Sequence, residues 1–295
     1  MIEAKILAHS KSSVNGKEIV TFELQYPRFI HSELMTHRLF SRNAASSRAV
    51  PVTKMIEQVS NSPAVPCHWG KNQPGMQAKE ELSGDELYDV KQYWDFAAEK
   101  AADYADLMNK KGAHKQIVNR ILEPFQMMKT IVTATEFDNF FWLRKHEDAQ
   151  PEIKRLAEVM WDALQSSEPV ELAAGDWHTP YFGAGYWQEG CGTPLEDALA
   201  ISSSCCAQVS YRKLDDSLEK AKDIFAKLIE SKPCHASPTE HQATPMEVDF
   251  DYITWPDGVT HMDRNGNLWS GNFCGFVQHR QLIPDNVCYN YKEQQ

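Results

Sequence analysis

Residues 36–48, from Thr36 to Arg48, read THRLFSRNAASSR. This stretch places one His, three Arg, one Asn, three Ser and one Thr within thirteen residues. A guanidinium group binds a phosphate through two parallel hydrogen bonds, and small residues let backbone N–H groups approach an anion closely. The stretch therefore indicates an anion-binding loop, and a solvated basic loop after a helix is the alternative interpretation.

The spacing of these residues resembles the signature R-H-R-x-x-S-x-N-x-x-S-x-R of the flavin-dependent thymidylate synthases. The positions that fall in register are His37, Arg38, Ser41, Asn43, Ser46 and Arg48. Thr36 stands where the family has its first Arg, and Ala44 stands where it usually has Glu. These two departures leave room for an altered substrate or cofactor geometry.

A second group of segments resembles the same family. Residues 118–124, VNRILEP, resemble V-A-R-x-x-L-P and place Arg120 on an Arg that binds the nucleotide phosphate. Residues 139–144, NFFWLR, resemble N-F-L-x-L-R. The segment AQPEI at 149–153 matches A-Q-W-E-I, with Pro in place of Trp.

A third group of segments also resembles the family, but these segments occur at different places along the chain than in the family. Residues 235–241, HASPTEH, resemble the flavin-contacting H-x-T-P-F-E-H motif, which normally precedes the signature. Residues 207–211, AQVSY, resemble the family's A-R-V-S-Y/F segment. We therefore predict a circularly permuted arrangement, in which residues 205–241 take the place of the N-terminal third. The predicted organisation is one catalytic domain over 1–295, with insertions at about 61–110 and 173–194.

The resemblance implies a mixed α/β (α+β) fold, with a mixed sheet and long helices, and specific roles for individual residues. The implied catalytic residues are Arg144 and Ser46. The implied substrate-binding residues are Glu33, Ser46, Arg48, Arg120 and Arg144. The implied cofactor-binding residues are His37, Arg38, Asn43, Asn139, Ser210, His235, Ser237 and Glu240. No metal ion is implied.

The reaction implied by the resemblance is reductive methylation of dUMP to dTMP. FAD is the implied cofactor, and NADPH and 5,10-methylenetetrahydrofolate are the implied co-substrates. Flavin can carry the hydride, so the protein mainly binds, orients and sets the electrostatics. The family builds each site from several subunits, which implies a homotetramer.

Composition limits the classes of protein that fit. The net charge of -11 argues against a general nucleic-acid binder, which would normally be basic. No apolar run reaches membrane-spanning length, and the N-terminal residues MIEAK lack a signal-peptide pattern. The seven cysteines form no C-x-x-C pair and no disulfide framework. We expect a cytoplasmic protein with reduced thiols and no zinc site.

The pattern along the chain predicts two strands near the N-terminus, followed mainly by helices. Strands are expected at 2–9 and 18–24, joined by a turn at Asn15-Gly16. Helices are expected at 28–37, 52–59, 85–111, 114–122, 137–143, 151–164, 195–209 and 215–229. Residues 125–135 fit a buried helix or a buried strand equally well. The signature, residues 61–78 and the Gly- and aromatic-rich segment 176–193 are expected to be loops.

Three alternatives to dUMP methylation remain open. Glu33 stands where the family often has Gln, so a carboxylate could meet the amino group of dCMP during C5 methylation or hydroxymethylation. The tripeptides at 66–68 and 233–235 read Pro-Cys-His, which resembles the nucleophile loop of classical thymidylate synthases. A degenerate flavin- or nucleotide-binding module without catalysis would explain the changes at Thr36 and Ala44.

Overall fold

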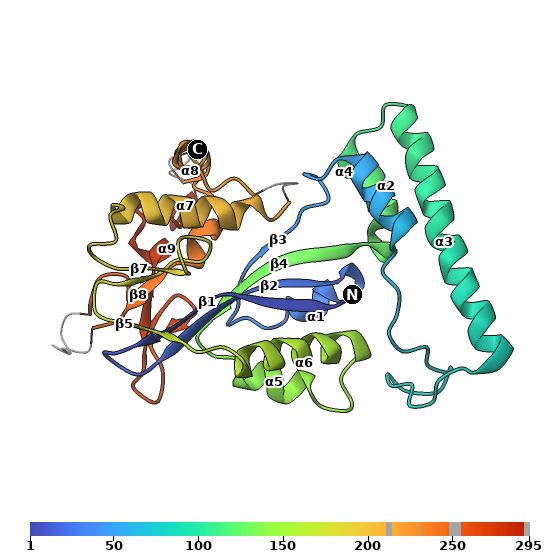
Figure 1. Cartoon of the computed structure of the whole chain (residues 1–295), viewed down its shortest axis with the longest axis horizontal. Helices are drawn as coiled ribbons and strands as arrows, with labels where there is room; N and C mark the ends of the chain where they lie inside the picture. The colour runs from blue at the N-terminus through green and yellow to red at the C-terminus, as the bar shows by residue number, and fades with distance from the viewer. Residues whose placement is uncertain (211–213, 230, 248–254, 292–295) are drawn as a thin grey trace.

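The computed structural model describes residues 1–210, 214–229, 231–247 and 255–291, and its centre is a five-stranded sheet (Figure 1). The strand order is β3-β4-β2-β1-β5. The strands are β1 (Glu3–Ser12), β2 (Glu18–Pro27), β3 (Ser41–Ala44), β4 (Met127–Ala134) and β5 (Val170–Leu172). The hairpin of β1 and β2 is confirmed, and its turn uses Gly16 at a φ of +73°, which favours glycine.

The structure corrects the prediction for one segment, residues 41–44, and decides between the two interpretations of another, residues 127–134. Residues 41–44 of the signature form an edge strand rather than a loop, because they pair antiparallel with Thr130–Thr133 of β4. Residues 127–134 are a strand, because β2 and β3 take up the backbone hydrogen bonds on both sides. Neither pairing can be read from local pattern, since both partners are distant in the chain.

One face of the sheet packs against helices. The helices α5 (Asp138–Arg144) and α6 (Pro151–Gln165) lie below the sheet in Figure 1 and join it in the largest apolar core. Phe22, Leu24 and Tyr26 alternate along β2 and are fully buried in this core. The helix expected at 28–37 is shorter, consisting of η1 (Arg28–Ile30) and α1 (His31–Leu34).

The other face of the sheet contacts the C-terminal half of the chain. This half contains α7 (Leu195–Ala207), η3 (Gln208–Ser210), α8 (Leu218–Leu228), η4 (Ser237–Glu240) and α9 (His279–Leu282). One small sheet has the order β12-β8-β6-β7, formed by Phe276–Gln278, Ala243–Pro245, Trp177–His178 and Tyr186–Trp187. Another has the order β11-β10-β9, formed by Phe273–Cys274, Leu268–Ser270 and His261–Met262.

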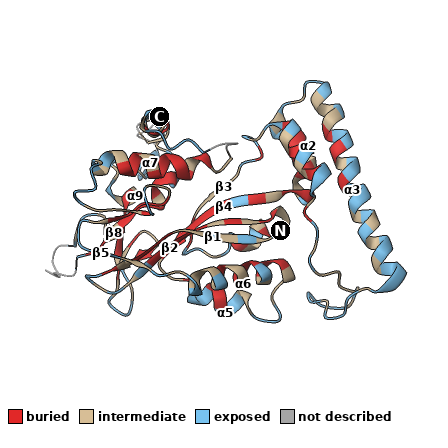
Figure 2. Ribbon diagram, in the orientation of Figure 1, coloured by how far each residue is buried: buried red, intermediate tan, exposed pale blue. Residues whose placement is uncertain are grey.

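A helical layer forms the end of the molecule opposite to the C-terminal half (Figure 1). It consists of α2 (Val52–Asn61), α3 (Gly84–Lys110), α4 (Lys115–Val118) and η2 (Asn119–Phe125). The expected helix at 114–122 is thus split into a short α-helix and a 3-10 helix that includes Pro124. The long helix α3 buries only Ala98, Ala102 and Ala105, and most of its surface is exposed or half-buried (Figure 2).

Two further observations concern cysteines and membranes. All seven cysteines are free thiols. Within the described residues, no helix combines the length and the apolar character that a membrane crossing requires.

A buried chain of hydrogen bonds joins the sheet to the C-terminal half. The ring of His178 bonds to Ser10 Oγ and to Thr21 Oγ1, both at 2.8 Å. Thr21 Oγ1 bonds to Thr133 Oγ1 at 2.7 Å, and Thr133 Oγ1 bonds to His241 Nδ1 at 2.8 Å. Every member is buried, and each group in the chain has a protein partner except His241 Nε2, which is buried without one.

These buried imidazoles predict a loss of stability in mild acid. Burial lowers the pKa of His178 and His241 to about 3, and that of His279 to about 4, from the ordinary 6.5. Between these values and 6.5 the unfolded chain binds protons that the folded chain does not, so the free energy of unfolding falls as pH falls below 6.5. Above 6.5 these groups are neutral in both states and contribute no pH dependence.

Urea unfolding at a series of pH values measures this effect. The slope expected from each fully buried histidine is at most about 1.4 kcal/mol per pH unit. His178→Gln should reduce the slope, whereas His261→Gln, at an exposed position, should leave it unchanged. An unfolding free energy that is flat between about pH 4.5 and about pH 6.5 would contradict buried neutral imidazoles.

Candidate active site

The last residue of α5, Arg144, is held against the turn that follows α1. Its Nε donates to His37 Nε2 at 2.9 Å, and its Nη2 lies 3.4 Å from Thr36 Oγ1. Its Nη1 lies 3.5 Å from Glu33 Oε2. The geometry therefore brings together three of the residues singled out in the sequence, Glu33, His37 and Arg144, together with the unusual Thr36.

The His37 ring has a fixed position within this group. It stacks on Phe40 at 5.7 Å between centroids and meets the edge of Phe140 at 4.9 Å. Burial is the largest cause that lowers the pKa of His37 to about 4, and the nearby charges of Arg144 and Arg42 contribute to the same lowering. His37 is therefore a neutral imidazole near pH 7.

Arg42 is a structural part of the site that the sequence analysis did not single out. Its Nη1 donates to the carbonyl oxygens of Met35 at 2.8 Å and His37 at 3.3 Å. Met35 follows the end of α1, where carbonyl groups lack helical partners, and His37 O in the following turn also accepts the Phe40 N–H at 3.3 Å. The alternation of the signature strand could have placed Arg42 on the opposite face from Asn43, but its two acceptors depend on the tertiary structure.

Glu33 and Arg144 line a cavity of about 1320 Å³. Phe29 and Trp94 form part of its apolar wall. Another wall is the loop over residues 66–79, which is attached to the α5–α6 region at two points. Glu152 Oε1 accepts the Cys67 N–H at 2.6 Å, and Gln77 Nε2 donates to Asp148 O at 3.3 Å.

A second group of signature residues contacts the C-terminal half. Asn43 Nδ2 donates to Cys206 O at 3.1 Å, and the Ser46 N–H donates to Ser210 Oγ at 2.7 Å. Strand β3 also packs against η4, the element that holds Ser237 and Glu240. The segments expected to replace the N-terminal third therefore lie beside the signature strand. Tyr211, the last residue of the AQVSY segment, lies outside the described residues.

The two other arginines predicted to bind phosphate lie in a different environment from Arg144. Arg120 is exposed and pairs with Glu123 Oε1 at 2.8 Å. The same oxygen accepts Ser47 Oγ at 3.1 Å and lies 3.0 Å from Arg28. Arg48 is exposed on the adjoining loop. Within one chain, Arg48 and Arg120 thus share a neighbourhood through Ser47 and Glu123, while Arg144 has other partners.

The remaining predicted cofactor residues are dispersed. Arg38 and Asn139 are exposed on the turn after α1 and on α5, and His235 and Ser237 are exposed at and before η4. Glu240 is half-buried and forms an ion pair with Arg280. The carboxylate of Glu240 therefore has a cationic partner from α9 that local sequence did not indicate.

The Pro-Cys-His alternative at residues 66–68 has a poor nucleophile. Burial raises the pKa of the Cys67 thiol to about 12, and the Glu152 carboxylate raises it in the same direction. Because the thiolate is the nucleophilic form, this environment disfavours covalent catalysis by Cys67 near neutral pH.

The fold and the site define a mixed α/β protein in which a polar signature forms the edge strand of the central sheet. Residues 2–170 match the family described as thymidylate synthase complementing protein. This match spans more than half of the chain, and the chain therefore belongs to that family. Residues 171–295, which include 205–241, lie outside the match, so the circular permutation stays a prediction.

Individual known proteins are similar to about half of this chain. The flavin-dependent thymidylate synthase of Aquifex aeolicus (strain VF5) is 29% identical over 154 residues, which are 48% of this chain and 44% of the relative. The chain thus spans less than half the length of this curated relative. A crystal structure of the UMP/dUMP methylase PolB from Streptomyces cacaoi bound with 5-Br UMP is 20% identical, with a TM-score of 0.47, and covers 56% of this chain and 88% of that chain. The same protein bound with 5-Br dUMP is 19% identical, with a TM-score of 0.45 and coverages of 56% and 90%.

Thiol labelling tests the environment of Cys67. With iodoacetamide near pH 8, Cys67 should react on the order of 1000-fold more slowly than an ordinary thiol, in proportion to its smaller thiolate fraction. Cys191 and Cys288, which are exposed like Cys67 but lie away from Glu152, serve as internal standards in the same mass-spectrometric digest. Glu152→Gln should accelerate the labelling of Cys67, and a wild-type rate at Cys67 equal to that of Cys191 would contradict the raised pKa.

Proposed function

We propose that this protein is a flavin-dependent enzyme that methylates C5 of a pyrimidine deoxynucleotide, converting dUMP to dTMP. The observation that carries the proposal is Glu33 and Arg144 at the wall of a large cavity, with His37 bound to Arg144, in the part of the chain that matches the family. Fixed donors and acceptors on a partly apolar cavity are what a heteroaromatic ligand requires. FAD is the proposed cofactor, and NADPH and methylenetetrahydrofolate are the proposed co-substrates.

Each group of residues has a proposed task. Arg144 donates to the pyrimidine ring and stabilises negative charge that develops on it. Ser46, Arg48 and Arg120 bind the nucleotide phosphate from the loop and η2. A bound flavin supplies hydride-transfer chemistry. The donors and acceptors that we propose for its polar edge and phosphates are His37, Arg38, Asn43, Asn139, Ser210, His235, Ser237 and Glu240.

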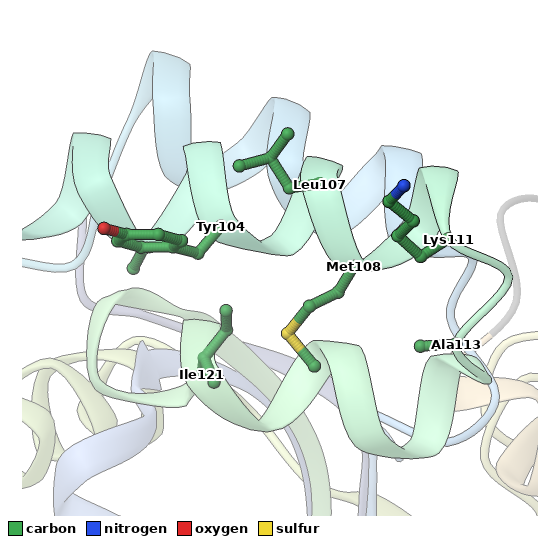
Figure 3. A pocket seen from close by; sticks show the side chains of 7 residues that line it. Tyr104, Leu107, Met108, Lys111, Ala113 and Ile121 are labelled. Atoms are coloured by element: carbon green, nitrogen blue, oxygen red, sulfur yellow. The ribbon is translucent and has the colours of Figure 1, made fainter.

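Within one chain, Arg144 is separated from Arg48 and Arg120. This separation supports assembly of several copies, which we propose to be a homotetramer. A second copy could bring its Arg48 and Arg120 to the Arg144 of the first. The surface that fits a second copy lies on α3 and η2, where an apolar cavity of about 530 Å³ is lined by Tyr104, Leu107, Met108 and Ile121 (Figure 3). Ile121 adjoins Arg120 in the chain, so a copy seated there lies next to a proposed phosphate ligand.

A related reaction on dCMP is the second candidate. Glu33 is a carboxylate whose oxygen lies 3.5 Å from Arg144 and which lines the same cavity. An acceptor of this kind suits the exocyclic amino group of cytosine. A binding module without catalysis is the third candidate, because Thr36 stands in place of an arginine in the resembled signature.

Product analysis distinguishes these candidates. Purified protein is incubated with FAD, NADPH, methylenetetrahydrofolate and either dUMP or dCMP, and the nucleotides are separated and weighed by mass spectrometry. We expect dUMP to gain the mass of one CH2 group. Methylated or hydroxymethylated dCMP would favour the second candidate, and an unchanged nucleotide with a colourless protein would favour a module without catalysis.

Arg144→Gln should lower kcat/KM for the nucleotide by about 100-fold or more, because one fixed donor to developing charge is removed. Arg264→Gln, at an exposed turn between β9 and β10, is the matched control and should retain wild-type activity. Equal activity of Arg144→Gln and the wild type would remove Arg144 from the mechanism.

A further inference from the structure

We propose that Arg144 locks His37 as the neutral imidazole protonated on Nδ1, and that this Nδ1–H donates a hydrogen bond to a carbonyl oxygen of a bound heteroaromatic ring. The second half of this inference rests on the proposed function, because the ring belongs to the flavin or to the pyrimidine. Arg144 is thereby a positioning residue for His37 in addition to any contact of its own with the ligand.

The tautomer follows from the direction of one hydrogen bond. Arg144 Nε lies 2.9 Å from His37 Nε2. A guanidinium carries only N–H donors and keeps its charge in proteins, so it cannot accept a hydrogen bond. His37 Nε2 must therefore present its lone pair, and a neutral ring then has its proton on Nδ1. An imidazolium would place an N–H against the N–H of Arg144, which this contact excludes.

The guanidinium that imposes this state is itself held in place. Thr36 Oγ1 donates to Glu33 O at 2.7 Å, so its lone pairs are left to face Arg144 Nη2 at 3.4 Å. Glu33 faces Nη1 of the same guanidinium. An arginine at position 36 would instead place a second cation against Arg144. Thr36 is thus compatible with the lock, which gives a physical role to this departure from the resembled signature.

The ring and its backbone are also fixed. Phe40 and Phe140 hold the plane of the imidazole, and Arg42 holds the carbonyl oxygen of His37 from strand β3. The direction of the Nδ1–H bond is therefore set before any ligand binds. A donor fixed in this way gives specificity for an acceptor atom at one position, because no rearrangement is needed on binding.

The charged groups around His37 come from each neighbouring element. They are Arg144 from α5, Arg42 from β3, Glu33 from α1 and Arg38 from the turn itself. Arg144 and Arg42 both oppose a positive charge on the ring, and Glu33 is engaged by Arg144. The lock therefore predicts that His37 stays neutral from about pH 8 to about pH 5, a range in which an ordinary histidine changes charge.

Long-range 1H–15N correlation spectra of the histidine rings in the full-length protein test the lock without any ligand or activity. His37→Asn assigns the His37 signals by their disappearance. We expect the Nδ1–H tautomer for His37, unchanged from about pH 8 to about pH 5. In Arg144→Gln the His37 signals should titrate closer to the ordinary 6.5, and Arg264→Gln should match the wild type. An Nε2–H tautomer, or wild-type titration near 6.5, would overturn the lock.

Separate titrations with FAD and with dUMP then identify the acceptor. A shift of the His37 Nδ1–H signal with one ligand assigns the carbonyl oxygen to that ligand. His37→Asn, whose amide N–H lies near the position of Nδ1–H, should retain the affinity, whereas His37→Ala should weaken it by about 3- to 10-fold, the worth of one hydrogen bond. Binding of both ligands without any shift of His37 would overturn the second half of the inference. If neither ligand binds, the proposed function fails, and the ligand-free spectra still decide the lock.

Discussion

Strand β4 pairs with β2 along one edge and with β3 along the other, and these two ladders position the signature strand and α5. The β2–β4 ladder runs from Val20 opposite Ala134 to Pro27 opposite Met127, and β3 joins it with Asn43 opposite Ile131. A shift of one residue in the β3 register would turn Asn43 away from the C-terminal half and Arg42 away from α1. Because α5 begins shortly after β4 ends, the same ladder also places Arg144 beneath His37.

The two faces of this sheet are covered by different chemistry. The face toward α5 and α6 is an apolar core, in which the aromatic rings of Phe40 and Phe140 contact the His37 ring. The opposite face contacts the C-terminal half through the hydrogen-bonded chain from Ser10 to His241. Such a chain requires every donor to meet its acceptor, and it therefore fixes one docked arrangement more strictly than apolar contact alone.

The charges of the site illustrate how an acidic protein can hold an anionic ligand. Arg144 faces Glu33, Arg120 faces Glu123, and Arg280 faces Glu240. Arg144 and Arg120 are thus already oriented by carboxylates of this chain, so their geometry is formed before binding. The carboxylates also offset part of the positive charge, which is consistent with a net charge of -11. A nucleotide phosphate would share or replace these carboxylates.

The sequence by itself determined the β1–β2 hairpin, α2, the long helix α3, α6 and α7, because turn residues and apolar periodicity are local properties. It also determined the family, because the spacing of His37, Arg38, Ser41, Asn43, Ser46 and Arg48 lies within one uninterrupted segment. Only the tertiary structure decided that residues 41–44 are a strand and that residues 127–134 pair on both edges, since each needs a partner far away in the chain. The same reason applies to the site: Thr36 and Glu240 acquire their roles from Arg144 and Arg280, and such pairings depend on distances in space that no local pattern encodes.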